Sequence, residues 1–434
     1  MAREEPAGEG DSARDGAHKS AAVRGRIGIL ILVVGCAFAI YWVSSIVLGA
    51  RKGPPFFGAD TWFYTKLAQA DVIERIPSDY HLDRITRFHP TTVVLAIVWM
   101  KILAPLSSWI DPLHLLRVMF AAIGAAGVWA AMSAFETVVA RGYAILFGII
   151  YALSFGVWYF ASVEESKIIT ASLSALYIAG YLHLRRRWTN RGAGLLTLIM
   201  LLGCLNEIVF GFLLIVPLVD AFLQRSTDLR LSKWIAAQAL AGVLALVILE
   251  GVINNWLLTG RKLPEEASHF SMMLFYMTSS AHSAPSLYLF LTNWLFFNIA
   301  APTTSADYAL PAWPHYKGYF EPSLANYLFS PATAALAAVS GIILAAILLP
   351  RYRASAFGNA SGIIVPLVAY TVLRGAFFFV FNPGEALLFS SAVTLPHMLI
   401  IAMPFAASSF PAKPVLLAAF GVLLLVVNGS FILG

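Results

Sequence analysis

Few ionisable side chains occur in this sequence, and those that interrupt its long apolar runs are the ones whose type and spacing could support chemistry. A charge held at membrane depth is costly, so it usually has a partner or a function. Carboxylates there can act as general bases, and guanidinium groups can bind phosphate. The candidates are Asp60, Tyr64, Arg84, Arg87, His89, Glu164, Glu165, Lys167, Asn206, Glu207, Arg374 and Glu385.

The first cluster lies in the polar stretch 51–89, which follows the first apolar run. Residues 60–75 suit a short helix that places Asp60, Tyr64 and Asp71 on one face. A carboxylate at Asp60, close to the end of an apolar span, could act as a general base on a lipid-linked substrate. The alternative is that Asp60 is the N-cap of an interfacial helix, because Asp is favoured at helix starts.

The same stretch closes with Arg84, Arg87 and His89, followed by Pro90. Two guanidinium groups at this depth could bind a lipid phosphate in a bidentate manner. The alternative is that both arginines only reach the headgroup layer. His89 alone is a weak candidate for catalysis, and a structural hydrogen bond is the alternative for it.

Glu164 and Glu165 stand between two apolar runs, with Lys167 two residues on. Paired acids could hold a metal ion or take an acid/base role. The alternative is a plain helix turn, capped by Ser162 and Ser166, with Lys167 as the counter-charge. No second cluster of ligand residues has a suitable spacing, so a divalent cation is possible but not required.

Two further sites lie deeper in apolar sequence. Asn206-Glu207 falls between two short apolar stretches, where a carboxylate has few purely structural uses. Arg374 lies inside an apolar run and needs a partner or a phosphate, and Glu385 follows at the outer end of that run. The aromatic segment around His315, Tyr316 and Lys317 could line an acceptor entrance, or could form part of an interfacial aromatic belt.

The composition places these residues in an integral membrane protein. The chain has 434 residues, of which 59% are hydrophobic and 12% charged, whereas soluble domains are about one quarter charged. The net charge of +6 comes from short clusters between apolar runs, so no basic face is available for a nucleic acid. Cys36 and Cys204 both lie in apolar stretches, which excludes a disulfide framework.

The positive-inside rule predicts how the chain is threaded. Residues 1–26 are polar and are expected to form a disordered cytoplasmic tail before a polytopic transmembrane domain over 27–434. The stretch 51–89 becomes the first exoplasmic, catalytic loop, and 257–326 an exoplasmic or re-entrant segment. Cytoplasmic anchors are expected at Arg24, Arg26, Arg185, Arg186, Arg187, Arg191, Arg225, Arg230, Lys233, Arg351 and Arg353.

The fold predicted is an all-α integral membrane protein with about eleven transmembrane helices and a long first exoplasmic loop that carries interfacial helices. Residues 193–223 are expected to form two half-helices that turn at Asn206-Glu207. Residues 90–110 are expected to dip into the membrane and return, and 286–301 to lie at or re-enter the interface. Full spans are expected at 27–50, 113–134, 143–162, 166–184, 234–256, 327–349, 361–380, 386–408 and 414–433.

The order of these features resembles the GT-C superfamily of polytopic glycosyltransferases, most of all the bacterial relatives of protein O-mannosyltransferases. That family has an early acid in the first external loop, a His-Pro at the end of the loop, an external Glu, a basic-Trp cytoplasmic turn and a half-helix hairpin. The matching positions are Gly58-Ala59-Asp60, His89-Pro90, Trp158 with Ala161 and Glu164 or Glu165, Arg186-Arg187-Trp188, and Gly194-Leu195 through Asn206-Glu207.

The likeness covers roughly residues 27 to 225 and has departures. The His-Pro-Pro of the family is His89-Pro90-Thr91 here, and its Glu-x-Tyr is Glu165-Ser166-Lys167. The first loop has no Asp-x-Asp, which argues against the metal-dependent oligosaccharyltransferase branch.

The resemblance implies transfer of a sugar from a polyprenyl-phosphate donor to a lipid, glycan or protein acceptor, by one inverting displacement on the outer side of a bacterial inner membrane. It implies that Asp60 deprotonates the acceptor hydroxyl and that Arg87 and Arg374 stabilise the leaving phosphate. Glu165 or Glu207 would then hydrogen-bond sugar hydroxyls. The alternatives are a transporter or lipid flippase, which also uses interrupted helices, and a structural subunit.

Overall fold

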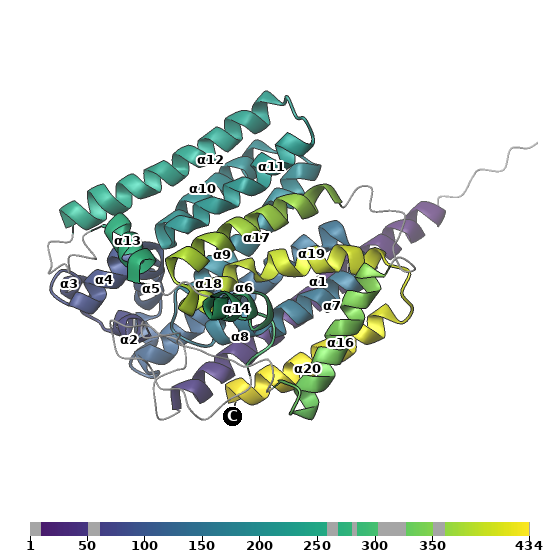
Figure 1. The fold of residues 1–434 in the computed structure, drawn as a ribbon, viewed down its shortest axis with the longest axis horizontal. Helices are drawn as coiled ribbons and strands as arrows, with labels where there is room; N and C mark the ends of the chain where they lie inside the picture. Colours follow the sequence, from purple (N-terminus) through teal and green to yellow (C-terminus); the bar gives the residue numbers. More distant parts are fainter. Residues whose placement is uncertain are drawn as a thin grey trace, which may run out of the picture.

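The computed structural model describes residues 10–50, 61–257, 268–279, 284–302, 327–349 and 361–433, and within these ranges the regular elements are all helices (Figure 1). Eight of the described helices are long and apolar enough to cross a membrane, or nine if one bent pair counts as a span. The predicted all-α, multi-pass membrane class is therefore confirmed.

The long helices fall on the predicted spans. The bent pair, α7 (Arg141–Leu153) and α8 (Phe155–Ala161), turns by 56° at Ser154 and covers the span expected at 143–162. Helix α1 begins at Gly10 and so extends into the stretch predicted to be a tail. The remaining long helices are α1 (Gly10–Ala50), α6 (Pro112–Val138), α9 (Lys167–Arg186), α12 (Leu229–Val247) with its π-helical continuation η4 (Ile248–Leu257), α16 (Pro331–Leu348), α17 (Ser361–Phe381), α18 (Ala386–Ser390) with η9 (Ser391–Val393) and α19 (Thr394–Ala407), and α20 (Lys413–Leu433).

The predicted half-helix pair corresponds to α10 (Asn190–Asn206) and to η3 (Ile208–Leu214) with α11 (Ile215–Leu223). Glu207 separates them with extended backbone, at φ −156° and ψ 110°. Both pieces are shorter than the long helices. The count of about eleven transmembrane helices, which includes these two half-helices, stays a prediction.

The segment predicted to dip and return contains α5 (Pro90–Ile102), whose thirteen residues reach about 20 Å, short of a hydrocarbon core of about 30 Å. Near its start, Thr91 Oγ1 donates to the carbonyl of Leu202, close to the end of α10. Near its end, Trp99 Nε1 donates to the carbonyl of Leu115, in the first turn of α6. Helices α6 and α9 begin, and α10 ends, at one end of the bundle. We call it the cavity end, after the cavity described below. Both ends of α5 make their contacts at this end of the bundle.

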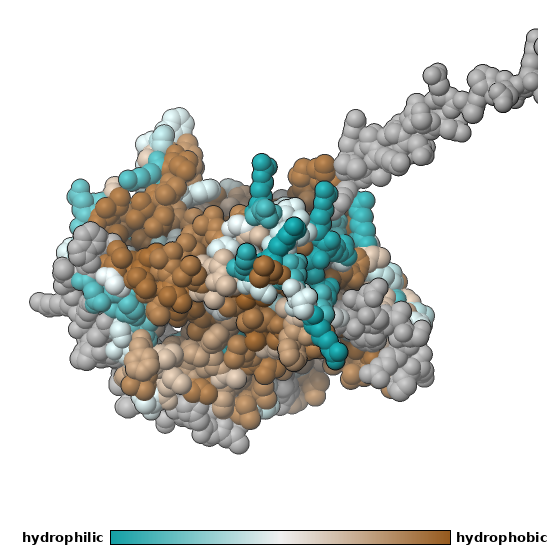
Figure 2. Space-filling model, turned by 90° about the horizontal axis from the view of Figure 1, so that it is seen from above, coloured by the Kyte–Doolittle hydropathy of each residue, from teal (hydrophilic) through white to brown (hydrophobic). Residues whose placement is uncertain are grey.

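Close helix packing fixes the centre of the bundle. A Cβ added to Gly127 of α6 would lie 2.6 Å from Ser172 Oγ of α9, and one added to Gly124 would lie 2.6 Å from Ala161 Cβ. Small residues at such positions let membrane helices approach closely, because lipid gives little hydrophobic drive for their association. Figure 2 shows the outer surface of the bundle, where a broad hydrophobic area lies between hydrophilic groups toward the left and right of the view.

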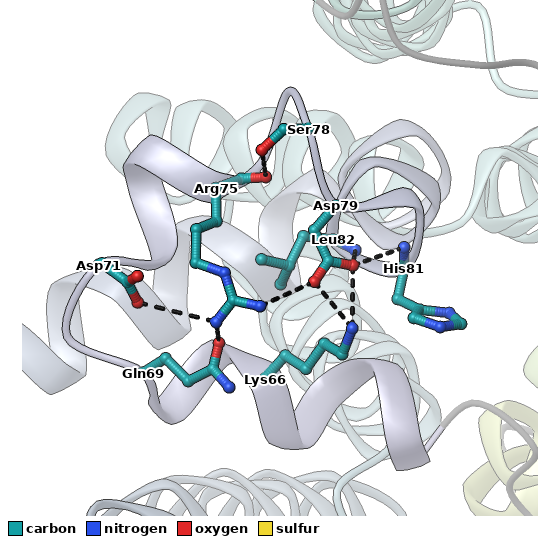
Figure 3. A network of polar contacts seen from close by, with 8 residues as sticks. All are labelled: Lys66, Gln69, Asp71, Arg75, Ser78, Asp79, His81 and Leu82. Atoms are coloured by element: carbon teal, nitrogen blue, oxygen red, sulfur yellow. Dashed lines mark hydrogen bonds and ion pairs between the residues drawn. The ribbon is translucent and has the colours of Figure 1, made fainter.

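Short helices of the first predicted loop cover the cavity end: α2 (Thr61–Thr65), η1 (Lys66–Ala68), α3 (Val72–Arg75) and α4 (Tyr80–Phe88) (Figure 1). Asp79 holds them together (Figure 3). Its carboxylate accepts from the backbone N–H of His81 at 2.9 Å and of Leu82 at 3.4 Å, from Lys66 Nζ at 2.7 Å and from Arg75 Nη2 at 3.1 Å. Asp79 is thus both the N-cap of α4 and the ion-pair partner of η1 and α3.

Asp79→Asn should lower the free energy of unfolding by about 1 to 2 kcal/mol, because the cap is weakened and the ion pairs are lost. Burial alone would raise the pKa of Asp79, but the Lys66 ammonium and the two backbone N–H groups outweigh it, so the pKa lies below its usual value. The contribution of Asp79 is therefore present above the unfolded pKa of about 4 and is lost as the pH falls through the lower folded pKa.

Thermal unfolding in detergent at pH 7 and pH 3 measures both effects. Asp71→Asn is the matched control, since Asp71 is exposed and its ion pair with Arg75 is long, with 3.8 Å between Oδ1 and Nη1. Equal unfolding midpoints for the two variants at pH 7 would contradict the role given to Asp79.

Candidate functional site

A cavity of about 590 Å³ lies at the cavity end, between the first-loop helix α4, the start of α9, helix α18, the break after α10, and the ends of α12 and α17. Helix α13 (His269–Ser279) closes one side of it. Six of the residues chosen from the sequence line this cavity although they come from four separate segments of the chain: Arg84, His89, Glu165, Lys167, Glu207 and Glu385.

The rest of the wall consists mostly of aromatic side chains and of apolar ones, among them two flexible methionines. Such a lining offers faces for flat or apolar groups, and methionine adapts its shape to what it contacts. The apolar and aromatic residues are Phe63, Ile85, Phe88, Ile208, Val209, Phe212, Leu246, Phe270, Met272, Met273, Tyr276, Phe377, Phe378, Phe381, Leu387, Leu388 and Phe389.

Asn206 anchors the polar side of the wall. Its side-chain oxygen accepts from Thr92 Oγ1 at 2.6 Å, and its Nδ2 donates to Thr170 Oγ1 at 3.0 Å and to the Ser166 carbonyl at 3.3 Å. Its backbone carbonyl lies 2.6 Å from His89 Nδ1. A single buried amide therefore ties α5, α9 and α10 together, which is a positioning role behind the cavity surface.

His89 is held as a neutral imidazole. Burial lowers its pKa to about 3, with the Lys167 charge acting in the same direction and the Asn206 carbonyl opposing it. Because the Asn206 carbonyl can only accept, the neutral ring donates its Nδ1 proton there. The remaining nitrogen, Nε2, is then an unprotonated acceptor in a residue that lines the cavity.

Glu207 and Arg374 form a buried ion pair at the helix break. Arg374 Nη2 donates to Glu207 Oε1, and the guanidinium also lies 4.9 Å from the ring centroid of Phe378. The Arg374 side chain is fully buried and is not among the cavity-lining residues, whereas Glu207 lines the cavity and its buried Oε2 has no hydrogen-bond partner among the described residues. Arg374 therefore fixes Glu207, which faces the cavity.

Glu165 and Lys167 bring one negative and one positive group to the start of α9. Glu165 Oε1 accepts from the backbone N–H of Ser166 at 2.9 Å and from Ser166 Oγ at 3.1 Å. Lys167 Nζ lies 4.5 Å from the ring centroid of Phe389, so its cation rests against an aromatic face of the wall. Both residues are almost fully buried.

Four more of the predicted residues lie, like Asn206, beside the cavity and not in its lining. Glu164 pairs with Arg117 of α6. Arg87 makes two hydrogen bonds to Asp83, at 2.7 and 2.8 Å, and contacts Asn254 of η4. The other two are Arg374, described above, and Tyr64, a buried residue whose ring centroid lies 6.3 Å from that of His89.

Asp60 lies outside the described residues, as do His315, Tyr316 and Lys317. In the sequence, Asp60 directly precedes Thr61, the first residue of α2, and stands three residues before Phe63, which lines the cavity.

Sequence reasoning missed one cavity residue with a strong partner. His269, the first residue of α13, lines the cavity, and its Nδ1 lies 2.8 Å from Glu250 Oε1 of η4. A lone histidine after an unremarkable polar stretch gave no signal, and Glu250, a carboxylate inside the span predicted at 234–256, was not chosen as a candidate.

The arrangement combines cations, acids and a carboxylate–histidine pair around one mainly aromatic space. Cations can bind a phosphate, carboxylates can accept hydrogen bonds from hydroxyls, and the histidines can accept a proton. Among the described residues, no group of three or more His, Cys, Asp or Glu side chains is placed to hold a metal ion. No protein-family model and no curated protein matches this sequence.

Arg374→Met should lower the free energy of unfolding by about 3 to 5 kcal/mol, because it leaves the buried Glu207 carboxylate without its ion-pair partner. The double variant Arg374→Met/Glu207→Gln should recover much of this loss, since no unpaired charge then remains at the break. Thermal unfolding in detergent measures all three proteins.

Arg141→Met is the control, because Arg141 is exposed at the start of α7. Its substitution should change stability by less than about 0.5 kcal/mol. A double variant no more stable than Arg374→Met would show that the ion pair is not what makes the arginine necessary.

Proposed function

We propose that this protein is a membrane glycosyltransferase that transfers a sugar from a polyprenyl-phosphate donor to a hydroxyl acceptor. The observation that carries the proposal is the cavity at one end of a multi-pass bundle, where cations and carboxylates share a mainly aromatic space. The resemblance to the GT-C superfamily, drawn from the sequence, supports the same reaction. The acceptor is a lipid, a glycan or a protein.

Arg84 and Lys167 are the cations that we assign to the donor phosphate. Both line the cavity, whereas Arg87 and Arg374, the arginines to which the sequence resemblance gave this role, do not line it and pair with Asp83 and Glu207. As the glycosidic bond breaks, negative charge grows on the phosphate oxygen, and nearby fixed cations stabilise it. Arg87 and Arg374 act indirectly, by holding α4 and Glu207 in place.

Glu165, Glu207 and Glu385 are the groups that we assign to sugar hydroxyls. Carboxylates accept hydrogen bonds from hydroxyl groups, and sugars commonly lie against aromatic faces such as Phe378 and Phe389 in this wall. The apolar part around Met272, Met273 and Tyr276 suits the first isoprene units of the donor.

The enzyme is expected to lie in a bacterial inner membrane with the cavity facing outward. Arg185, Arg186 and Arg187 at the end of α9 stand at the helix end opposite the cavity residues Glu165 and Lys167, and Arg225 follows the end of α11. The positive-inside rule would place these arginines in the cytoplasm. The polyprenyl-phosphate sugar would then be used on the outer side.

A lipid flippase or transporter is the second candidate, favoured by the break at Glu207 and by its buried pair with Arg374. Interrupted helices with ionisable groups are common in transporters. The gathering of the cavity residues at one end of the bundle favours the enzyme, since a transporter is expected to bind its substrate near the midplane.

Native mass spectrometry of the detergent-solubilised protein tests donor binding with polyprenyl phosphate as the probe. Lys167→Met should weaken the adduct about tenfold or more, because a charge-assisted contact to phosphate is lost. Lys101→Met is the matched control, since Lys101 is exposed on α5.

Equal adducts for wild type, Lys167→Met and Lys101→Met would contradict the phosphate site. Two results together would favour the flippase instead: a specific adduct without sugar transfer, and movement of the lipid between the leaflets of vesicles that contain the protein.

A further inference from the structure

We propose that His269, oriented by Glu250, is the base that takes the proton from the acceptor hydroxyl. This inference rests on the proposed function and deepens it, because it assigns to a described residue the role that the sequence resemblance implies for Asp60.

The Glu250 carboxylate fixes His269 from two directions. Oε1 accepts from the His269 backbone N–H at 2.7 Å and lies 2.8 Å from its Nδ1. The ring also packs edge-on against Phe88, with 5.0 Å between ring centroids. Backbone and side chain are therefore both held, so the imidazole has one defined orientation.

This geometry selects the tautomer. A carboxylate oxygen accepts hydrogen bonds, so Nδ1 carries a proton and donates it to Glu250. Nε2 is then the basic nitrogen. It is buried, it has no hydrogen-bond partner among the described residues, and it belongs to a residue that lines the cavity.

A chain of polar contacts holds Glu250 in turn. Asn254 Nδ2 donates to Glu250 Oε2 at 3.0 Å, and the Asn254 side-chain oxygen accepts from Arg87 Nη1. Arg87 is itself bound by Asp83 of the same helix, α4. The first-loop helix α4 and the π-helical stretch η4 are thus linked through polar groups to Glu250, the residue that orients His269.

A purely structural role would explain part of this arrangement, because Glu250 caps the first turn of α13. It would not explain a basic nitrogen kept without a hydrogen bond at the cavity wall, since burying an unsatisfied polar atom costs about 1 to 3 kcal/mol. Base, orienting acid and open cavity together form the arrangement expected of a general base.

His89 gives the contrast inside the same cavity. Its Nδ1 is bound by a neutral backbone carbonyl, and the Lys167 ammonium opposes a positive charge on its ring. His269 has a carboxylate at the equivalent position. A carboxylate can balance the charge that a ring gains when it takes a proton, and a neutral carbonyl cannot. The geometry therefore assigns the base to His269 and leaves His89 as a hydrogen-bond acceptor for substrate.

The proton and electron balance of the step is simple. The acceptor oxygen forms a bond to the anomeric carbon while its proton moves to Nε2 of His269. The bond from the anomeric carbon to the phosphate oxygen breaks, and its electron pair stays on the leaving polyprenyl phosphate. The negative charge of Glu250 balances the positive charge of the imidazolium that forms. The imidazolium then loses its proton to water when the products depart.

The test uses the full chain with a panel of polyprenyl-phosphate-linked hexoses and pentoses, and with water or an octyl hexoside as acceptor. Release of polyprenyl phosphate measures turnover, and native mass spectrometry measures donor binding. His269→Gln should lose about 10²- to 10⁴-fold in turnover while donor binding is retained. Glu250→Gln should lower turnover in the same direction, because the imidazolium loses its counter-charge.

His114→Gln is the matched control, because His114 also stands beside a carboxylate, with 3.9 Å between its Nδ1 and Asp111, but is exposed at the start of α6. It should turn over like wild type. Added imidazole should partly restore turnover in His269→Ala and not in Asp60→Asn, a readout that a merely structural role would not move.

Near-normal turnover of His269→Gln together with a loss in Asp60→Asn would overturn the inference and leave the proposed function intact, with Asp60 as the base. A loss in His269→Ala that imidazole does not restore would also overturn it. A wild type that neither binds polyprenyl phosphate nor turns over any donor would reject the proposed function, and this inference with it.

Discussion

Helix α10 ends among apolar helices, and the rest of the cavity end depends on how the polar groups at that ending are satisfied. Lipid offers no hydrogen bonds, so each such group must find its partner in the protein. Asn206 binds α5 and α9, and Glu207 binds Arg374 of α17. The break that would otherwise be a defect joins four segments of the chain and sets one wall of the cavity between them.

The charged residues near the cavity fall into an outer and an inner group. Those of the outer group form ion pairs, as Arg87 does with Asp83, Arg117 with Glu164, and Arg374 with the cavity-lining Glu207. Those of the inner group, among them Arg84 and Lys167, line the cavity. Outer pairs keep the helices rigid and leave the inner side chains in a mainly aromatic space, where interactions with a bound charge are stronger than in water.

The sequence predicted the helices and most polar clusters of this site, but it could not predict which member of each cluster faces the cavity. Long apolar runs and the Asn206-Glu207 break are visible as composition. The choice between Arg84 and Arg87, or between Glu164 and Glu165, depends on helix phase and on partners such as Asp83 and Arg117 that come from packing.

His269 marks the limit of what the sequence could predict for the site. Its partner, Glu250, belongs to another helix, and nothing in the local pattern around either residue indicates that they meet. Asp60, the acid on which the sequence resemblance depends most, lies outside the described residues, so its role stays a prediction.

The π-helical stretch η4 has a consequence for how the membrane helix α12 presents its side chains. Val243 and Val247 lie on the exposed side of α12. Glu250 and Asn254 follow at the spacing that would continue this same side in an uninterrupted α-helix. Such a helix would point a carboxylate into lipid. The wider π turns take an extra residue per turn and rotate Glu250 and Asn254 inward, so a change of helical pitch converts a lipid-facing position into one that serves the protein interior.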